Sequence, residues 1–189
     1  MTRCTDNQSE VFDVVDENDN VVGKETRGEV HKNQNLIHRS VGVVVFDSKG
    51  RVFLQQRSST KDTDPLKWTI SASGHVSSVI TRRVRPLALL RSDPDFIYEE
   101  AAHRELVEEL GVSLEIEPIA KYICREPNET EMQMIFKAYS DGPFKLHPEE
   151  IKQGKFFTLK DLIGAVKKGE IVLSYSGKMA LEKVGFIFP

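Results

Sequence analysis

The sequence predicts an α+β (α/β) fold in which a mixed β-sheet is sandwiched between helices. Three observations predict it. The 189 residues fall within the length of one domain, no repeat or low-complexity linker divides them, and strand-like and helix-like patterns are mixed along the chain. We therefore expect a single domain, residues 1–189.

The first predicted elements are two β-hairpins. Residues 10–15 alternate as a short strand, and an Asp/Asn/Glu cluster at residues 16–20 forms a turn before a second strand at 21–23, which predicts an N-terminal β-hairpin. Residues 41–46 have the length and β-branched content of a buried strand. After a turn at residues 47–50, residues 52–56 are expected to return as its partner.

The clearest predicted helix covers residues 98–110. Ala101, Ala102, Leu106 and Leu110 recur at helical spacing, and Gly111 supplies the C-cap. The remaining expected elements are strands at 68–72, 119–125 and 132–139, and helices at 159–168, ended by Gly169, and 178–184, ended by Gly185.

Composition excludes several classes of function. The formal net charge of −3 argues against a nucleic-acid polymer or an anionic membrane as the main partner. Apolar runs are far shorter than the ~18 residues of a membrane span. Cys4 and Cys124 show no paired spacing and are expected to be reduced thiols. These features indicate a cytoplasmic protein.

Three glutamates in the predicted helix carry the strongest chemical signal. Glu105, Glu108 and Glu109 stand at i, i+3 and i+4, so their carboxylates share one face and repel one another. A divalent cation would relieve this repulsion, and hard oxygen ligands favour Mg²⁺ or Mn²⁺. The alternative is a solvated acidic face in which Arg104 pairs with Glu108.

The order of residues 104–112 resembles the second half of the Nudix box. Arg104, Glu105, an aliphatic residue, Glu108, Glu109, Gly111 and an aliphatic residue follow in the order that the box requires. The resemblance implies a Nudix fold and a catalytic, metal-binding role for Glu105, Glu108 and Glu109. It also implies that Arg104 orients one of these carboxylates through a salt bridge.

The box is interrupted upstream. Its opening glycine is expected at Gly74, which lies thirty residues before Arg104, sixteen more than the family spacing, so residues 79–94 form an insertion. Counting back from Arg104 places Phe96 where the first box glutamate belongs, with Glu99 and Glu100 as out-of-register substitutes. The insertion is basic with an apolar side, and it is interpreted either as a lid over an anionic substrate or as a surface excursion.

A second resemblance covers roughly residues 10–185. Three histidines and two glutamates follow in the order of the single-metal site of type I isopentenyl diphosphate isomerase, a Nudix-superfamily enzyme; they are His31, His38, His75, Glu129 and Glu131. The same resemblance implies that Arg27, Arg57 and Lys61 grip a diphosphate through charge-assisted hydrogen bonds.

Two positions depart from the isomerase pattern. Ser73 stands where the isomerase has its proton-transferring cysteine, and a hydroxyl is a far weaker acid than a thiol of pKa about 8.5. Cys124 and Arg125 occupy the region of the isomerase's active-site tyrosine. The intact Arg-Glu-x-x-Glu-Glu motif is instead typical of the hydrolases. The chain thus resembles Nudix hydrolases that look like the isomerase but lack its cysteine.

The sequence therefore predicts a Mg²⁺- or Mn²⁺-dependent Nudix hydrolase that cleaves a diphosphate linkage in a small substrate, resembling a nucleoside or prenyl diphosphate. Glu150 is the candidate general base, with an exposed acidic turn as the alternative interpretation. Two further hypotheses stay open. One is an isopentenyl diphosphate isomerase-like enzyme with a substituted acid; the other is a catalytically impaired Nudix protein that binds a ligand.

Overall fold

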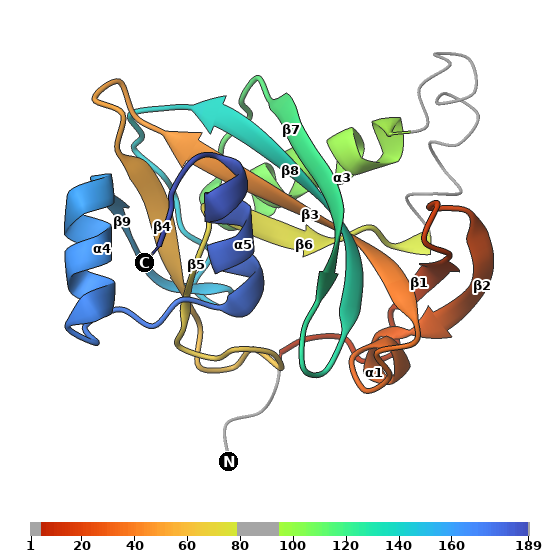
Figure 1. Cartoon of the computed structure of the whole chain (residues 1–189). Coiled ribbons are helices and arrows are strands. Elements are labelled where there is room, and N and C mark those ends of the chain that lie inside the picture. Colours follow the sequence, from red (N-terminus) through yellow and green to blue (C-terminus); the bar gives the residue numbers. More distant parts are fainter. Residues whose placement is uncertain (1–4, 79–94, 189) are drawn as a thin grey trace.

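The computed structural model describes residues 5–78 and 95–188 of the chain. The nine strands of these residues form one mixed sheet. Helix α3 (Phe96–Leu110) covers one face of the sheet, and helices α4 (Leu159–Lys167) and α5 (Tyr175–Lys183) cover the other (Figure 1). The predicted α+β sandwich is therefore confirmed.

Strand β3 (Ile37–Phe46) lies at the centre of the sheet. It runs antiparallel to β1 (Val11–Val15) and β6 (Ala72–His75) and parallel to β8 (Thr130–Tyr139). Its alternate side chains enter two different cores: Val43 packs in the core that contains α3, whereas Val44 packs with α4 and α5. Burial on both faces explains why residues 41–46 of this strand have no polar side chain.

The predicted N-terminal hairpin is confirmed. β1 pairs antiparallel with β2 (Val21–Thr26), and Asp16 in the turn accepts hydrogen bonds of 2.9 Å from the backbone N–H groups of Asn18 and Asn20. The carboxylate thus satisfies the backbone donors that a tight turn leaves unpaired.

The second predicted hairpin is only partly realised. β3 and β4 (Val52–Arg57) are antiparallel, but they pair only between Phe46 and Val52. The rest of β4 pairs with β5 (Trp68–Thr69) and β9 (Ile151–Phe157). β9 was not predicted, because its sequence has few β-branched residues and a central glycine. A Cβ atom at Gly154 would lie 2.2 Å from Phe53 Cζ, so packing against β4 requires this glycine.

Several element boundaries differ from the predictions. The strand expected at residues 68–72 is two strands, β5 and β6, because the Ser71 hydroxyl donates to Phe53 O at 2.6 Å and accepts from Val45 N–H at 2.7 Å. α5 begins three residues early because Ser174 caps it, accepting from Gly177 N–H at 3.1 Å. The strands β7 (Glu117–Arg125) and β8 and the helix α3 each begin about two residues early, and the short helix α1 (Arg27–Val30) was not predicted.

Two predictions fall wholly or partly outside the described residues. The expected insertion at residues 79–94 and Cys4 lie outside them, whereas Cys124 is a buried free thiol. None of the helices in the described ranges is long and apolar enough to cross a membrane.

Candidate functional site

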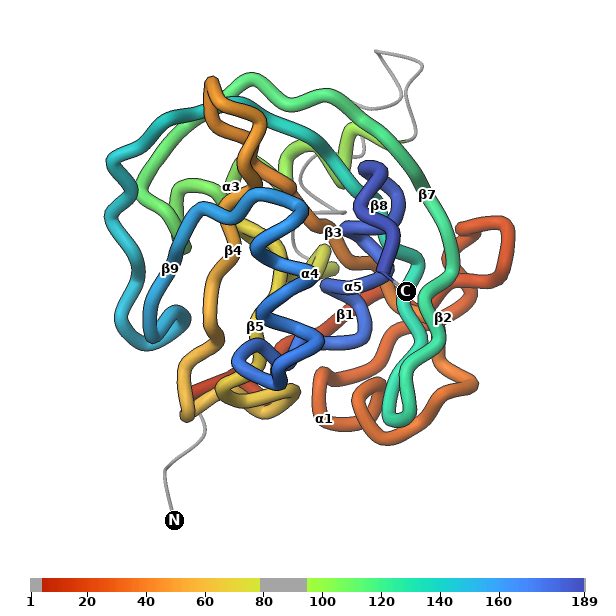
Figure 2. The backbone as a smooth tube through the Cα atoms, turned by 60° about the vertical axis from the view of Figure 1, so that its left-hand side comes forward, coloured from red at the N-terminus to blue at the C-terminus, as the bar shows by residue number. Residues whose placement is uncertain are grey.

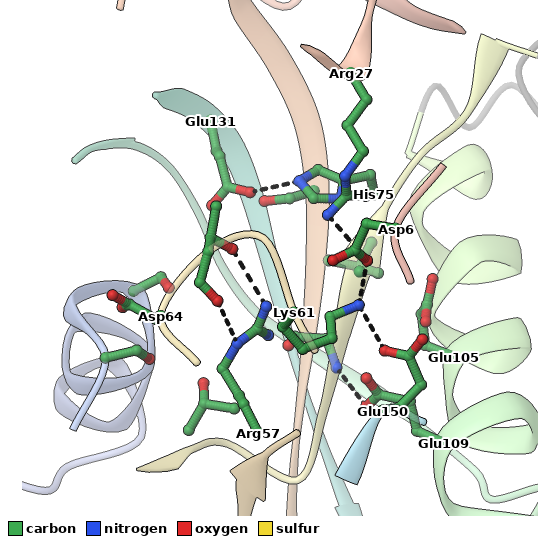
Figure 3. A pocket seen from close by; sticks show the side chains of 18 of the residues that line it. Asp6, Arg27, Arg57, Lys61, Asp64, His75, Glu105, Glu109, Glu131 and Glu150 are labelled. Atoms are coloured by element: carbon green, nitrogen blue, oxygen red, sulfur yellow. Dashed lines mark hydrogen bonds and ion pairs between the residues drawn. The ribbon is translucent and has the colours of Figure 1, made fainter. Parts of the chain in front are cut away.

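A cavity of about 380 Å³ opens where α3, β3, β6 and β8 meet the N-terminal segment and the start of α5 (Figure 3). Eleven of the thirteen side chains that the sequence singled out line this cavity. The other two, His31 and His38, contact the lining residue Glu129 at 3.0 and 3.7 Å. Segments far apart in the sequence are thus brought to one site.

Helix α3 directs two of the three glutamates predicted to bind metal into the cavity. Glu105 and Glu109 are buried, whereas the Glu108 side chain at the cavity rim is 56% exposed. Glu109 Oε2 accepts hydrogen bonds from Gln55 Nε2 at 2.7 Å and from Ser73 N–H at 3.1 Å. The three carboxylates predicted to act together therefore differ in environment: two are held inside and one faces solvent.

Arg104 connects the glutamate helix to β6. Its guanidinium donates to the backbone oxygen of His75 at 2.8 Å and pairs with Glu105 Oε1. It also lies 4.0 Å from Glu108, so both predicted pairings are present. The contact with Glu105 fits the orienting role expected for this arginine.

Gly74 brings the strand β6 directly onto the Glu105 carboxylate. A Cβ atom at this position would lie 2.1 Å from Glu105 Oε1 and 2.2 Å from its Cδ. Only glycine allows this approach, which gives a physical reason for the glycine that the Nudix pattern requires.

The buried glutamates are held at an electrostatic cost. Burial, with a further contribution from the charge of Glu150, raises the pKa of Glu109 to about 7. Burial also raises the pKa of Glu105 well above its ordinary value, although Arg104 opposes this. Carboxylates clustered in this way favour a cation between them, because a nearby positive charge stabilises their ionised form.

The predicted histidine–glutamate cluster forms beside the glutamate helix. One ligand atom from each of four residues, His31, His38, His75 and Glu129, lies within 4.8 Å of the others. Glu131 joins them, since its Oε1 lies 3.3 Å from His75 Nε2. The sheet register produces this arrangement: His38 on β3 stands opposite Glu131 on β8, and His75 on β6 stands opposite Ser40 on β3.

The donor atoms of this cluster fit a divalent cation. His31 Nε2, His75 Nε2 and Glu129 Oε2 are buried, and within the described part of the chain none makes a hydrogen bond of regular geometry, although His31 Nε2 lies 3.0 Å from Glu129 Oε2 and His75 Nε2 lies 3.3 Å from Glu131 Oε1. Burial lowers the pKa of His38 to about 3 and that of His75 well below its ordinary value, so both rings are neutral at pH 7. Neutral imidazoles with carboxylates are a common ligand set for divalent metals.

Two of the three basic residues expected to grip a diphosphate, Arg27 and Lys61, are already paired with carboxylates. Arg27 makes a two-point contact with Asp62, at 2.8 and 3.1 Å, and lies 3.5 Å from Asp6. Lys61 pairs with the same Asp6 carboxylate and, at 2.7 Å, with Glu150. Asp6 therefore lies between two cations of the predicted grip, and sequence reasoning missed both Asp6 and Asp62.

Asp6 reaches this position because the N-terminal segment runs beside the loop that follows β4 (Figure 2). Thr5 N–H donates to Thr60 O at 3.2 Å, and Asp6 Oδ2 accepts from the backbone N–H of Asp62 at 2.8 Å. No local sequence pattern around residue 6 indicates this contact, since its partners in that loop are more than fifty residues away.

Arg57 and Glu150 lie at the lower edge of the cavity in Figure 3. Arg57 is held by Thr63, donating to its backbone oxygen at 3.0 Å and to its hydroxyl at 3.2 Å. Glu150 is partly exposed, at 31% of its side chain, and contacts Lys61 rather than standing free in an acidic turn.

Four further positions bear on the resemblances to the Nudix box and to the isomerase. Phe96, which stands where the first box glutamate belongs, is a core residue at the start of α3. Glu99 and Glu100 are absent from the cavity lining, so neither replaces that glutamate there. Ser73 does line the cavity and is placed beside Glu109.

This fold and site define a known class of protein. The family model for the NUDIX domain matches residues 36–175, and the chain belongs to that family.

The curated relatives include isopentenyl-diphosphate Delta-isomerases. Isomerase II of Camptotheca acuminata is 33% identical over 93% of this chain and 60% of its own length. Isomerase I of the same plant is 32% identical over 93% of this chain and 80% of its own length. The chain thus spans only about three fifths of the length of the first of these relatives.

Among solved structures, DR0079 from Deinococcus radiodurans is similar with a TM-score of 0.71 and 24% identity, covering 92% of this chain and 98% of that one. The NUDIX domain of Shewanella oneidensis NrtR, complexed with ADP ribose, is similar with a TM-score of 0.56 and 18% identity, over 81% of this chain and 87% of that one. At these identities the likeness establishes the fold alone.

Proposed function

We propose that this chain is a metal-dependent Nudix hydrolase that cleaves a diphosphate linkage in a small substrate. The observation that carries the proposal is the convergence of Glu105 and Glu109 on the same cavity as Lys61 and Arg57. Acidic side chains for a cation and basic side chains for phosphate oxygens are the two parts that hydrolysis of a phosphoanhydride requires.

Glu105, Glu108 and Glu109 would hold one or more Mg²⁺ or Mn²⁺ ions, and the histidine–glutamate cluster would hold another divalent cation. When bound, such cations neutralise charge on phosphate oxygens and lower the pKa of water. Arg104 would keep the Glu105 carboxylate in place, because it is tied to the backbone of β6 as well.

The remaining steps fall to residues at the cavity edge. Lys61 and Arg57 would donate hydrogen bonds to the phosphoryl oxygens as negative charge builds there. Glu150 would accept the proton of the attacking water, and its contact with Lys61 keeps the carboxylate pointing into the cavity.

An isomerase is the second candidate function. Two observations favour it: the similarity to isopentenyl-diphosphate Delta-isomerases and the assembly of His31, His38, His75, Glu129 and Glu131 in one cluster. Ser73 argues against it, because a serine hydroxyl is a poor acid for protonating carbon. The hydrolase is therefore preferred.

The experiment that tests the proposal is phosphate or pyrophosphate release from a panel of diphosphate compounds with Mg²⁺ or Mn²⁺, with isopentenyl diphosphate isomerisation run in parallel. Metal-dependent release supports the hydrolase. Isomerase turnover by the wild-type protein would reverse the ranking. Metal-dependent ligand binding with neither activity would identify a non-catalytic binding protein.

Two variants of α3 connect the activity to the site. Glu109→Gln should lower turnover about 100-fold or more, about 2.7 kcal/mol of transition-state stabilisation. The midpoint temperature of thermal unfolding should not fall, because the substitution removes a buried charge and keeps an acceptor for Gln55 and Ser73. Glu100→Gln is the matched control, an exposed glutamate of the same helix outside the cavity. A Glu109→Gln protein with near wild-type turnover would refute the assignment.

A further inference from the structure

We infer that Gln55 is a positioning residue of the glutamate site, the cation site proposed at Glu105, Glu108 and Glu109. It holds the Glu109 carboxylate in the orientation in which that carboxylate can bind a cation. The inference rests on the proposed function. It adds a residue that lies outside both sequence patterns, the one at residues 104–112 and the order of histidines and glutamates.

Gln55 is a buried polar residue on β4, and it is only 2% exposed. Phe53, two positions earlier on the same strand, packs in the core that contains α3, so the side chain of Gln55 faces this helix as well. Glu109 projects from the same helix into the cavity (Figure 3). Burying an amide costs free energy unless its polar atoms are hydrogen-bonded, so the partners of Gln55 indicate what the residue does.

The amide nitrogen of Gln55 bridges two acceptors. Its Nε2 donates to Glu109 Oε2 at 2.7 Å and to Ser71 O at 3.1 Å. Both amide hydrogens are therefore used. The reversed amide would place its own oxygen against a backbone carbonyl oxygen and a carboxylate oxygen, which have no hydrogen to donate when the carboxylate is ionised. The neighbours of Gln55 thus determine which way its amide points.

The Ser71 end of this bridge is anchored in the sheet. Ser71 is fully buried, and its hydroxyl donates to Phe53 O at 2.6 Å and accepts from Val45 N–H at 2.7 Å. These two bonds fix Ser71 to β3 and β4. The amide of Gln55 therefore joins the sheet backbone to Glu109, so the sheet as well as the helix sets the position of this carboxylate.

A neutral donor suits a carboxylate that binds a cation. An amide orients the carboxylate and leaves its charge in place, whereas a lysine or arginine there would offset the charge and repel the cation. Ser73 N–H, the second donor, bonds to the same oxygen of Glu109 at 3.1 Å. Because both bonds end on Oε2, Oε1 can bind a cation while both are kept. Glu105 is held differently, through its ion pair with Arg104.

Replacing Gln55 by methionine removes the bridge and keeps a side chain of similar length. Changes to residues that orient metal ligands commonly lower metal affinity about 10- to 100-fold. In calorimetric titration with Mn²⁺ alone, Gln55→Met should lower the affinity of the glutamate site at least about tenfold and leave that of the histidine–glutamate cluster within about twofold. Glu109→Gln and His38→Asn assign the two sites, because each variant weakens one of them.

Gln153→Met is the matched control. Gln153 lies on β9, which pairs with β4; it is exposed, donates to Gln56 Oε1 at 2.6 Å and is absent from the cavity lining. This substitution should change neither affinity. A second variant, Gln55→Asn, keeps a polar amide that is one methylene shorter and tests the inference if the methionine variant does not fold. It should weaken the glutamate site in the same way.

Two results would overturn the inference. One is an unchanged Mn²⁺ affinity of the glutamate site in a folded Gln55 variant. The other is an equal loss of affinity at both sites, since that would show a general loosening of the fold instead of a displaced Glu109.

The failure of this inference and the failure of the proposed function are distinguishable, because Mn²⁺ binding is measured without substrate. A selective loss at the glutamate site in a protein that hydrolyses no diphosphate would retain the role of Gln55 and reject the hydrolase. Hydrolysis by the wild-type protein, with wild-type Mn²⁺ affinity in Gln55→Met, would retain the hydrolase and reject the role of Gln55.

Discussion

Gly74 gives the sharpest test of how the site is built. In Gly74→Ala, the new Cβ would lie 2.1 Å from Glu105 Oε1, whereas ordinary contacts require about 3.5 Å. The carboxylate must therefore retreat by about 1.4 Å, or β6 must separate from α3. A misplacement of about 1 Å in a catalytic group costs on the order of 100-fold in rate, about 2.7 kcal/mol of transition-state stabilisation.

The assay combines Mn²⁺ titration by calorimetry with phosphate release from the best diphosphate of the panel. We expect Gly74→Ala to lower Mn²⁺ affinity and to lower kcat/KM about 100-fold. Gly164→Ala is the matched control, because a Cβ atom there meets nothing within 4 Å of it in α4. It should leave activity unchanged and stabilise the helix by about 0.5–1 kcal/mol.

The outcome that refutes the reasoning is equally specific. If Gly74→Ala kept both its Mn²⁺ affinity and kcat/KM within about twofold of wild type, the Glu105 carboxylate would not need the position it occupies. The role of Gly74 as the opening residue of a working metal site would then be wrong.

Three further predictions follow from the same structure. His38→Asn should lower the affinity of the histidine–glutamate cluster for Mn²⁺ at least about tenfold. The control, His103→Asn on α3, lies outside the cluster and should not change this affinity. Equal Mn²⁺ binding by both variants would contradict the ligand set. Asp6→Asn should lower KM for diphosphates about fivefold, which corresponds to about 1 kcal/mol, because Arg27 and Lys61 lose a competing carboxylate. A higher KM would show that Asp6 instead helps Arg27 and Lys61 to bind the diphosphate. Gly42→Ala should lower the free energy of unfolding in urea by about 1–3 kcal/mol, because its Cβ would lie 2.4 Å from Ile70 Cδ1. An unchanged free energy of unfolding would show that the neighbouring core side chains rearrange to accommodate the methyl group.

The charge balance of the cavity gives these tests a common physical basis. Glu105, Glu109 and Glu131 are buried and have raised pKa values, first of all because burial disfavours their charged forms. Burial lowers the pKa of Lys61, but the charge of Glu150 and the hydrogen bond to Asp6 raise it overall. Arg27 and Lys61 are therefore each engaged by carboxylates, so binding of a diphosphate to these two cations requires an exchange of partners.

The sequence by itself determined much of this protein. The helical spacing of Glu105, Glu108 and Glu109, the β-branched run in β3 and the turn at Asp16 are local patterns, and each predicted its element because the relevant contacts lie within a few residues. The resemblance of residues 104–112 to the Nudix box gave the family, and the order of three histidines and two glutamates predicted side chains that the structure brings together.

Only the tertiary structure decided the rest. The contact of Gly74 with Glu105, the insertion of Asp6 between Arg27 and Lys61, and the pairing of β9 with β4 join residues separated by about twenty to one hundred positions. The cavity wall likewise combines residues from the loop after β4, the sheet and α5. Such contacts depend on how strands register and helices pack, and hydrophobic periodicity and residue spacing describe only the segment in which they occur.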